Sequence, residues 1–211
     1  MEAKKDKVVG LALWTKYLLA LLAFCLIGTG CGSGRDSVGA ARLGADENYS
    51  VMLERYTSKD TVFKDLEPRL TVTALLKSGP FREAYAHKYI RDYQLGPERA
   101  GDFLATQAEL AQGRLEFLLA ASSWKGADND LEKRTSAWRI FLDGDSLKPI
   151  EPVEIKLIKV VSPRLLGFFP FISPWDKVYE VRFDIPADSP RGNLTLHVTG
   201  VIGAARLNFR M

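Results

Sequence analysis

Residues 177–185 read KVYEVRFDI, and this stretch sets the fold of the chain more clearly than any other. Apolar and charged side chains alternate through it, with Tyr179, Val181, Phe183 and Ile185 on one side and Glu180, Arg182 and Asp184 on the other. Successive side chains of a β-strand point to opposite faces, so the pattern predicts a strand with one buried and one polar face. A turn is expected at 186–192, where Pro and Gly interrupt the alternation.

Strand patterns also occur on both sides of this segment. Residues 194–198 and 205–209 predict a C-terminal hairpin joined across 200–203. The segments upstream are 69–76, 114–121, 137–142 and 153–160. In the last of these the apolar residues change parity, which predicts a β-bulge near Leu157.

A helical pair is expected at about 80–112, between the first two of these strands. Ser78, Gly79 and Pro80 precede an aromatic stripe at four-residue spacing, which consists of Phe81, Tyr85, Tyr89 and Tyr93. We expect this stripe to pack on the sheet, and a groove for a sugar or a partner is the alternative. Seven short strands with one helical insertion predict a mainly β fold with a small α part. The expected architecture is an antiparallel β-sandwich, immunoglobulin-like in outline.

The N-terminal segment has the three-part layout of an export signal. Four lysines lie in residues 1–16, and residues 17–27 (YLLALLAFCLI) form an apolar run of eleven. Since a membrane-spanning helix needs about 20 apolar residues, the run indicates a cleaved signal. An uncleaved anchor is the alternative.

The small residues Gly28, Thr29 and Gly30 directly before Cys31 make residues 1–31 resemble a bacterial lipoprotein signal peptide. The resemblance implies cleavage before Cys31, fatty acylation of Cys31 and anchoring in the cell envelope. It also implies the periplasmic face of the outer membrane in a Gram-negative host, because Gly32 stands where inner-membrane lipoproteins commonly have aspartate. An ordinary cleaved signal is the alternative.

The rest of the chain is expected to be a tethered single domain. Residues 32–46 (GSGRDSVGAARLGAD) are rich in Gly, Ser and Ala, which predicts a flexible linker. The chain then divides into a signal peptide at 1–30, a tether at 31–47 and one β-rich domain at 48–211. Removing residues 1–30 leaves 29 − 4 = 25 basic and 26 − 2 = 24 acidic residues, a balance that argues against nucleic-acid binding.

No motif of known chemistry occurs in the sequence. There is no G-x-S-x-G elbow and no glycine-rich phosphate loop, and we expect no catalytic residue, no metal and no cofactor. His87 and His197 are expected to be solvated side chains. The acidic segments 128–130 and 143–145 are typical of turns and lack the ligand spacing of an EF-hand. Because Cys25 and Cys31 are the only cysteines, the exported part contains no internal disulfide.

Residues 165–175 (LLGFFPFISPW) combine many apolar side chains with two prolines, which oppose regular strand pairing. One interpretation is that the loop covers the end of the sandwich and belongs to the core. The other is an exposed patch in which Phe168, Phe169, Phe171 and Trp175 contact an envelope protein or lipid.

These features indicate two candidate functions. The first is a non-catalytic, lipid-anchored envelope protein that docks onto a larger assembly through an envelope protein partner. The alternative is a carrier that holds an apolar, lipid-like ligand between the helical pair and the sheet, for which a cavity of about 300 Å³ or more is needed. An enzyme of a type that these motifs do not identify ranks third.

Overall fold

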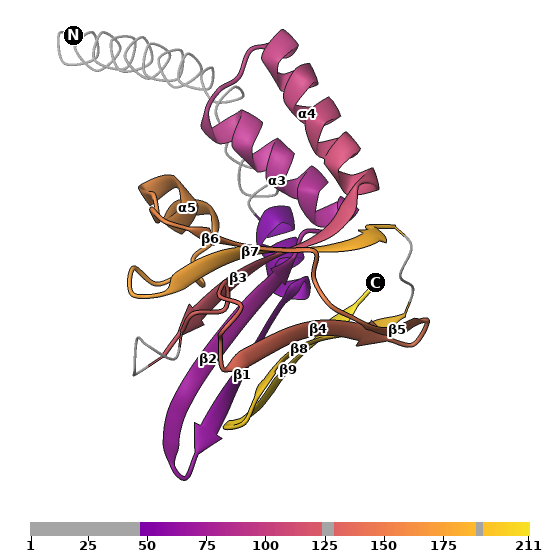
Figure 1. Cartoon of the computed structure of the whole chain (residues 1–211). Coiled ribbons are helices and arrows are strands. Elements are labelled where there is room, and N and C mark those ends of the chain that lie inside the picture. Colours follow the sequence, from indigo (N-terminus) through magenta and orange to yellow (C-terminus); the bar gives the residue numbers. More distant parts are fainter. Residues whose placement is uncertain (1–46, 124–128, 189–191) are drawn as a thin grey trace, which may run out of the picture. The chain divides into compact units, whose positions relative to one another are not determined.

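The computed structural model describes residues 47–123, 129–188 and 192–211, which belong to one compact unit that begins at Gly44 and ends at Met211. Two antiparallel sheets with helices beside them form this unit (Figure 1). The predicted mainly β sandwich with a helical insertion is therefore confirmed. The predicted signal peptide, Cys31 and nearly all of the tether lie outside the described residues.

The strands are divided five and four between the sheets. The first sheet has the order β1 (Thr57–Lys64), β2 (Glu67–Leu76), β3 (Arg114–Ser122), β7 (Lys177–Pro186) and β6 (Glu154–Ile158). The second has the order β5 (Leu147–Ile150), β4 (Trp138–Gly144), β8 (Asn193–Gly200) and β9 (Gly203–Arg210).

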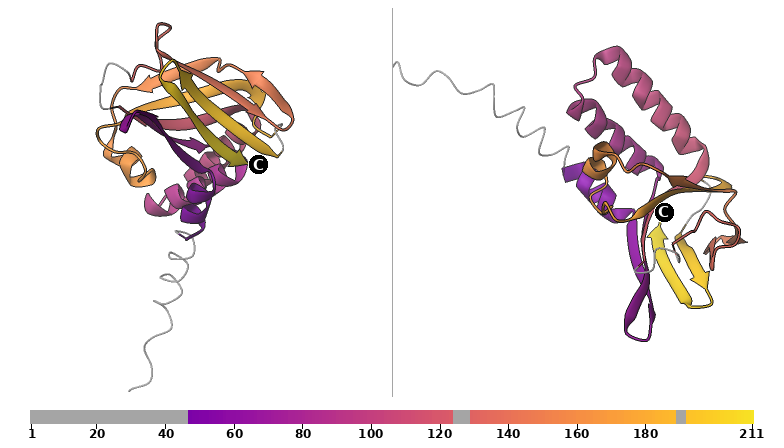
Figure 2. Two further views of the ribbon diagram at one scale, coloured as in Figure 1. Left: turned by 90° about the horizontal axis from the view of Figure 1, so that it is seen from below. Right: turned by 60° about the vertical axis from the view of Figure 1, so that its left-hand side comes forward.

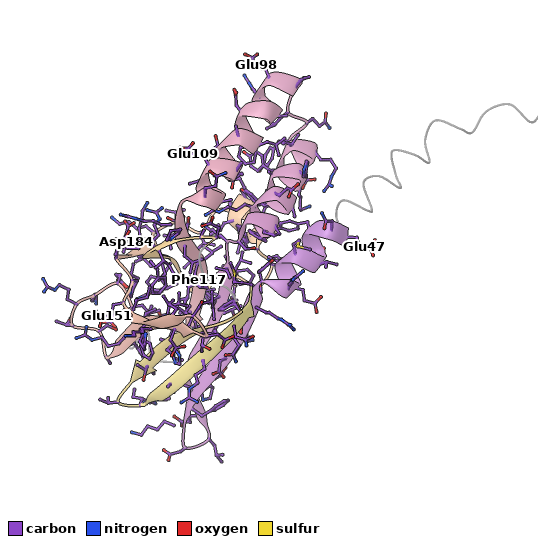
Figure 3. The ribbon with its side chains drawn as sticks, turned by 90° about the vertical axis from the view of Figure 1, so that its right-hand side faces the viewer. Glu47, Glu98, Glu109, Phe117, Glu151 and Asp184 are labelled. Atoms are coloured by element: carbon purple, nitrogen blue, oxygen red, sulfur yellow. The ribbon has the colours of Figure 1, made fainter. Side chains whose placement is uncertain are left out.

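The register of the first sheet separates two kinds of buried surface. Ala74, Leu119 and Tyr179 are partners across β2, β3 and β7, and this row faces the second sheet. On the same face, the ring of Phe117 lies 5.2 Å from that of Phe209 in β9. Figure 3 shows Phe117 between the two sheets. The alternate rows face the helices, and we call their side of the sheet the helical face.

Three labelled helices accompany the sheets: α3 (Gly79–Asp92), α4 (Pro97–Gln112) and α5 (Pro163–Phe168), and residues 47–55 are also helical. The α3–α4 pair forms the predicted insertion, and the Ser78 hydroxyl caps α3 by accepting from the Phe81 amide at 3.4 Å. Helix α4 buries no residue and lies alongside α3, as Figure 2 also shows. The helix at 47–55 and α5 were not predicted, so the expectation of helices in one insertion only is wrong.

One detail of the strand prediction, the β-bulge near Leu157, is also wrong. The register of β6 with β7 runs without a shift from Glu154 to Ile158, so there is no bulge near Leu157. The change of parity arises from Ile158, the last residue of the strand, which is half-buried on the face opposite Leu157, and from Val160, which lies beyond the strand and is 76% exposed.

The sequence pattern did not predict strand β1, because its side chains form hydrogen bonds at the edge of the sandwich more than they pack in the core. An Asp60 carboxylate oxygen accepts from the Arg206 amide of β9 at 2.8 Å, and the Ser58 hydroxyl accepts from the Asn208 amide at 3.1 Å. These bonds satisfy amide groups that an open edge strand would expose. The two sheets are therefore joined along one side by side chains.

Candidate functional site

A pocket of about 330 Å³ lies between α3, α4, α5 and the helical face of the five-stranded sheet. Its volume falls within the range of about 300–1,000 Å³ that is usual for small-molecule sites. The apolar part of its lining is Phe81, Tyr85, Leu110, Leu118, Ile158, Leu165, Phe168 and Phe169. The polar part is Lys77, Arg82, Gln107, Glu116, Ser162, Arg164, Glu180 and Arg182. We call this cavity the interlayer pocket.

Arg82 is the central polar residue of the interlayer pocket, and its side chain is only 6% exposed. It donates to Glu116 Oε2 at 2.8 Å, to the Lys77 carbonyl at 3.1 Å and to Gln107 Oε1 at 3.4 Å. Glu116 lies on β3, Lys77 directly follows β2, and Gln107 lies on α4. A single guanidinium therefore ties the helical pair to the sheet.

Glu116 is the buried carboxylate of this network, with a side chain that is 9% exposed. Lys77 Nζ donates to its second oxygen at 2.5 Å. Burial alone would raise the pKa of Glu116, but the charges and hydrogen bonds of Lys77 and Arg82 outweigh it and lower the pKa. Glu116 is thus held as a carboxylate with both oxygens engaged, an arrangement that suits a structural anion better than a group that exchanges protons.

Phe81 and Tyr85 of the aromatic stripe line the pocket, and the main partners of the stripe are aromatic rings of other helices. Tyr85 stacks with Phe169 at 6.1 Å, and Tyr89 packs 5.7 Å from Phe168 and 4.5 Å from Phe103 of α4. The stripe was expected to pack on the sheet, and the structure places α5 and its following residue against it instead.

The four residues of the predicted interaction loop fall in different environments. Phe168 and Phe169 are buried, at 6% and 7% exposure, and Tyr49 of the 47–55 helix donates to the Phe168 carbonyl at 2.5 Å. Phe171 is half-buried, whereas Trp175 is 89% exposed. The core interpretation therefore applies to Phe168 and Phe169, and Trp175 is the member that an incoming partner can reach.

Neither histidine lines the interlayer pocket. His87 is 57% exposed, beside Glu83 at 4.0 Å. His197 is only 15% exposed, because its ring stacks on Phe141 at 4.3 Å and its Nε2 lies 3.1 Å from Asp143. The expectation that His197 is solvated is therefore wrong. Within the described residues, no group of three or more His, Cys, Asp or Glu side chains is arranged to hold a metal ion.

The polar lining of the interlayer pocket was not predicted from the sequence. One signal was available: Glu116 is the only charged residue in 115–121 (LEFLLAA), where an isolated charge in an apolar strand predicts a buried partner. The partner itself could not be found in this way, because Arg82 is distant in sequence and reaches Glu116 only once α3 lies across the sheet.

Comparisons with known proteins add little to this description. No family model matches the chain, and no curated protein matches it. Among solved structures, the chain is similar to a protein of unknown function from Burkholderia pseudomallei, with 12% identity and a TM-score of 0.44. The alignment covers 81% of this chain and 87% of that protein. Among the residues that the structure describes, no helix is long and apolar enough to cross a membrane.

Proposed function

We propose that this protein is a non-catalytic binding protein of the bacterial cell envelope, anchored by a lipid on Cys31, whose interlayer pocket holds a small ligand with an apolar part. The observation that carries the proposal is the pocket itself. It lies between the helical pair and the sheet, has a volume of about 330 Å³, and is lined by aromatic and aliphatic side chains beside a small set of fixed polar groups. This combination is typical of ligand-binding sites.

The polar chemistry of the pocket favours binding over catalysis. Glu116 is engaged by two cations, and the Ser162 hydroxyl caps α5 by accepting from the Leu165 amide at 3.2 Å. A carboxylate held ionised by paired cations does not supply the adjustable proton that general acid catalysis requires.

The burial of Phe168 and Phe169 also bears on the choice between the two functions. An assembly subunit was expected to use residues 165–175 as an exposed patch. Two of the four aromatic side chains named there, Phe168 and Phe169, are instead buried in the core. Trp175 favours docking as a second candidate, since its indole is 89% exposed and tryptophan is enriched at protein interfaces.

Photo-crosslinking inside the native envelope distinguishes the two functions. A benzophenone side chain is placed at Leu110, which lines the pocket and is 43% exposed, and in separate variants at Trp175 and at Val201, which is 98% exposed. The proposal predicts that only the Leu110 position captures a molecule of lipid size. Protein adducts at Trp175 with no small adduct at Leu110 would show a docking subunit instead and overturn the proposal.

A further inference from the structure

The charges around the interlayer pocket define the chemistry of its ligand more closely, and this definition rests on the function proposed above. The lining contains four cations, Lys77, Arg82, Arg164 and Arg182, and two carboxylates, Glu116 and Glu180, so its formal charge is 4 − 2 = +2. The location of this excess depends on which cations already have partners.

Both carboxylates are engaged by cations of the protein. Glu116 is held by Lys77 at 2.5 Å and by Arg82 at 2.8 Å. The oxygens of Glu180 lie 3.7 Å from Lys77 and 3.7 Å from Arg182, and Lys156 lies 3.9 Å away. Arg182 is further paired with Glu154 at 2.7 Å. The base of the pocket is thus a closed network, and it leaves no carboxylate free to attract a cationic ligand.

Arg164 is different, because it makes no ion pair within residues 47–123, 129–188 and 192–211 and its side chain is exposed. It belongs to α5 and lines the interlayer pocket. Tyr85 lines the same pocket as Arg164: burial raises the pKa of the Tyr85 phenol, and the positive charge of Arg164 opposes that rise. The phenol stays protonated and can donate a hydrogen bond.

Gln107 adds a further donor from α4. Its side-chain oxygen accepts from Arg82, so its NH₂ group is the part that remains for a ligand. Arg164, Tyr85 and Gln107 therefore offer donors, while both oxygens of Glu116 and the side-chain oxygen of Gln107 already accept hydrogen bonds from the protein. Donors gathered around an unpaired guanidinium recognise an anion rich in acceptor oxygens, such as a carboxylate or a phosphate.

The remaining wall is apolar and suits an aliphatic chain. Leu118 on the sheet is 1% exposed, and Ile158 and Leu165 are half-buried beside it. The aromatic rings of this wall already pack on one another: Tyr85 stacks with Phe81 at 6.3 Å and with Phe169 at 6.1 Å. A flexible chain can follow such a wall, whereas a sugar needs an open ring face to stack on.

We propose that the interlayer pocket binds an anionic amphiphile, with a carboxylate or phosphate head at Arg164 and an aliphatic chain along Leu118, Ile158 and Leu165. A fatty acid and a single-chain phospholipid share this chemistry. The geometry assigns Arg164 as the residue that selects the charged head over a neutral one.

Three photoactivatable probes with the same sixteen-carbon chain test the proposal: palmitic acid, palmitoyl lysophosphatidic acid and hexadecanol. The full-length protein is reconstituted in nanodiscs of phosphatidylcholine, and labelled peptides are identified after irradiation. We expect the acid, the lysophosphatidic acid or both to label pocket peptides at a concentration about tenfold lower than hexadecanol, which corresponds to about 1.4 kcal/mol. Labelling by one anionic probe alone identifies the source of the head group.

Arg164→Ala is expected to raise the half-maximal concentration of the anionic probe about tenfold and to leave that of hexadecanol unchanged. Arg99→Ala is the matched control, since it removes an exposed arginine of α4 that lies outside the pocket lining. Equal labelling by all three probes with no effect of Arg164→Ala would overturn the selection of an anion and leave the pocket as a binding site. Failure of every probe to label the pocket would overturn the proposed function as well.

Discussion

Replacing Arg82 by methionine removes the cation that joins the helical pair to the sheet while keeping an apolar side chain of similar length. Glu116 then stays 9% exposed with Lys77 as its remaining close cation, and the Lys77 carbonyl and Gln107 lose their donor. Removing one partner of a buried ion pair costs about 3–5 kcal/mol, because the other charge remains buried. For a domain of this size each kcal/mol lowers the melting temperature by about 2–4 °C, so we expect a decrease of roughly 6–20 °C.

Arg182→Met is the matched control, because Arg182 forms an ion pair of nearly equal length in a more exposed place. Its guanidinium lies 2.7 Å from Glu154, and the two side chains are 37% and 45% exposed. Exposed ion pairs contribute about 0–1 kcal/mol, so the decrease should stay below about 4 °C. Thermal unfolding of the full-length protein in nonionic detergent, followed by circular dichroism, measures both variants. Equal decreases in the two would refute the claim that burial makes the Arg82 network important.

Three further predictions concern pH, packing and the anchor. Since the pKa of Glu116 is lower in the folded protein than in the unfolded chain, its stabilising contribution is present above the unfolded value and is lost as pH falls through the folded value. Glu116→Gln should therefore flatten the loss of stability measured by urea unfolding as pH falls below about 4.5, and an unchanged slope would contradict this. Phe168→Ala should cost about 3–5 kcal/mol and Trp175→Ala no more than about 0.5 kcal/mol in the same assay, and a reversed order would contradict the burial of Phe168. Cys31→Ser should abolish labelling by radioactive palmitate and leave a precursor of higher mass, so persistent labelling would exclude a lipid on this residue.

The strands that could be predicted are those whose side chains follow the two-residue period of the sheet. In β7, Tyr179, Val181 and Phe183 are all fully buried against the second sheet, so the alternation in the sequence reports the packing directly. In β1, Val62 is the only buried side chain, and the strand is stabilised instead by bonds from Asp60 and Ser58 to β9. A role of this kind leaves no apolar period for sequence analysis to detect.

Helix α5 shows a different limit. The two prolines in 165–175 suggested an irregular loop, although Pro163, just before this range, stands in the first turn of α5, where proline is well tolerated, and Ser162 caps the helix. That local signal was present in the sequence. The sequence carries no such signal for the burial of Phe168, because that burial results from contacts with Tyr85 and Tyr89 on a helix distant in sequence.

The candidate site could be predicted least, because its parts come together only in three dimensions. Lys77, Arg82 and Glu116 meet at the junction of β2, α3 and β3, and Arg164 reaches the same pocket from α5. In the sequence these residues are charges on separate elements, and only Glu116, isolated in an apolar strand, carries a sign of burial. Their pairing depends on how the helical pair lies across the sheet, which spacing along the chain does not determine.

Native mass spectrometry of the full-length protein, released from its own membranes, shows whether the interlayer pocket holds a ligand. We expect a small molecule that stays bound under gentle conditions and is lost on unfolding, unlike the lipid attached to Cys31. Ile158→Trp, which adds bulk to the pocket lining, should remove that molecule while the protein keeps a melting temperature close to that of the wild type. An empty wild-type protein, or a ligand retained equally by both proteins, would rule out a ligand in this pocket.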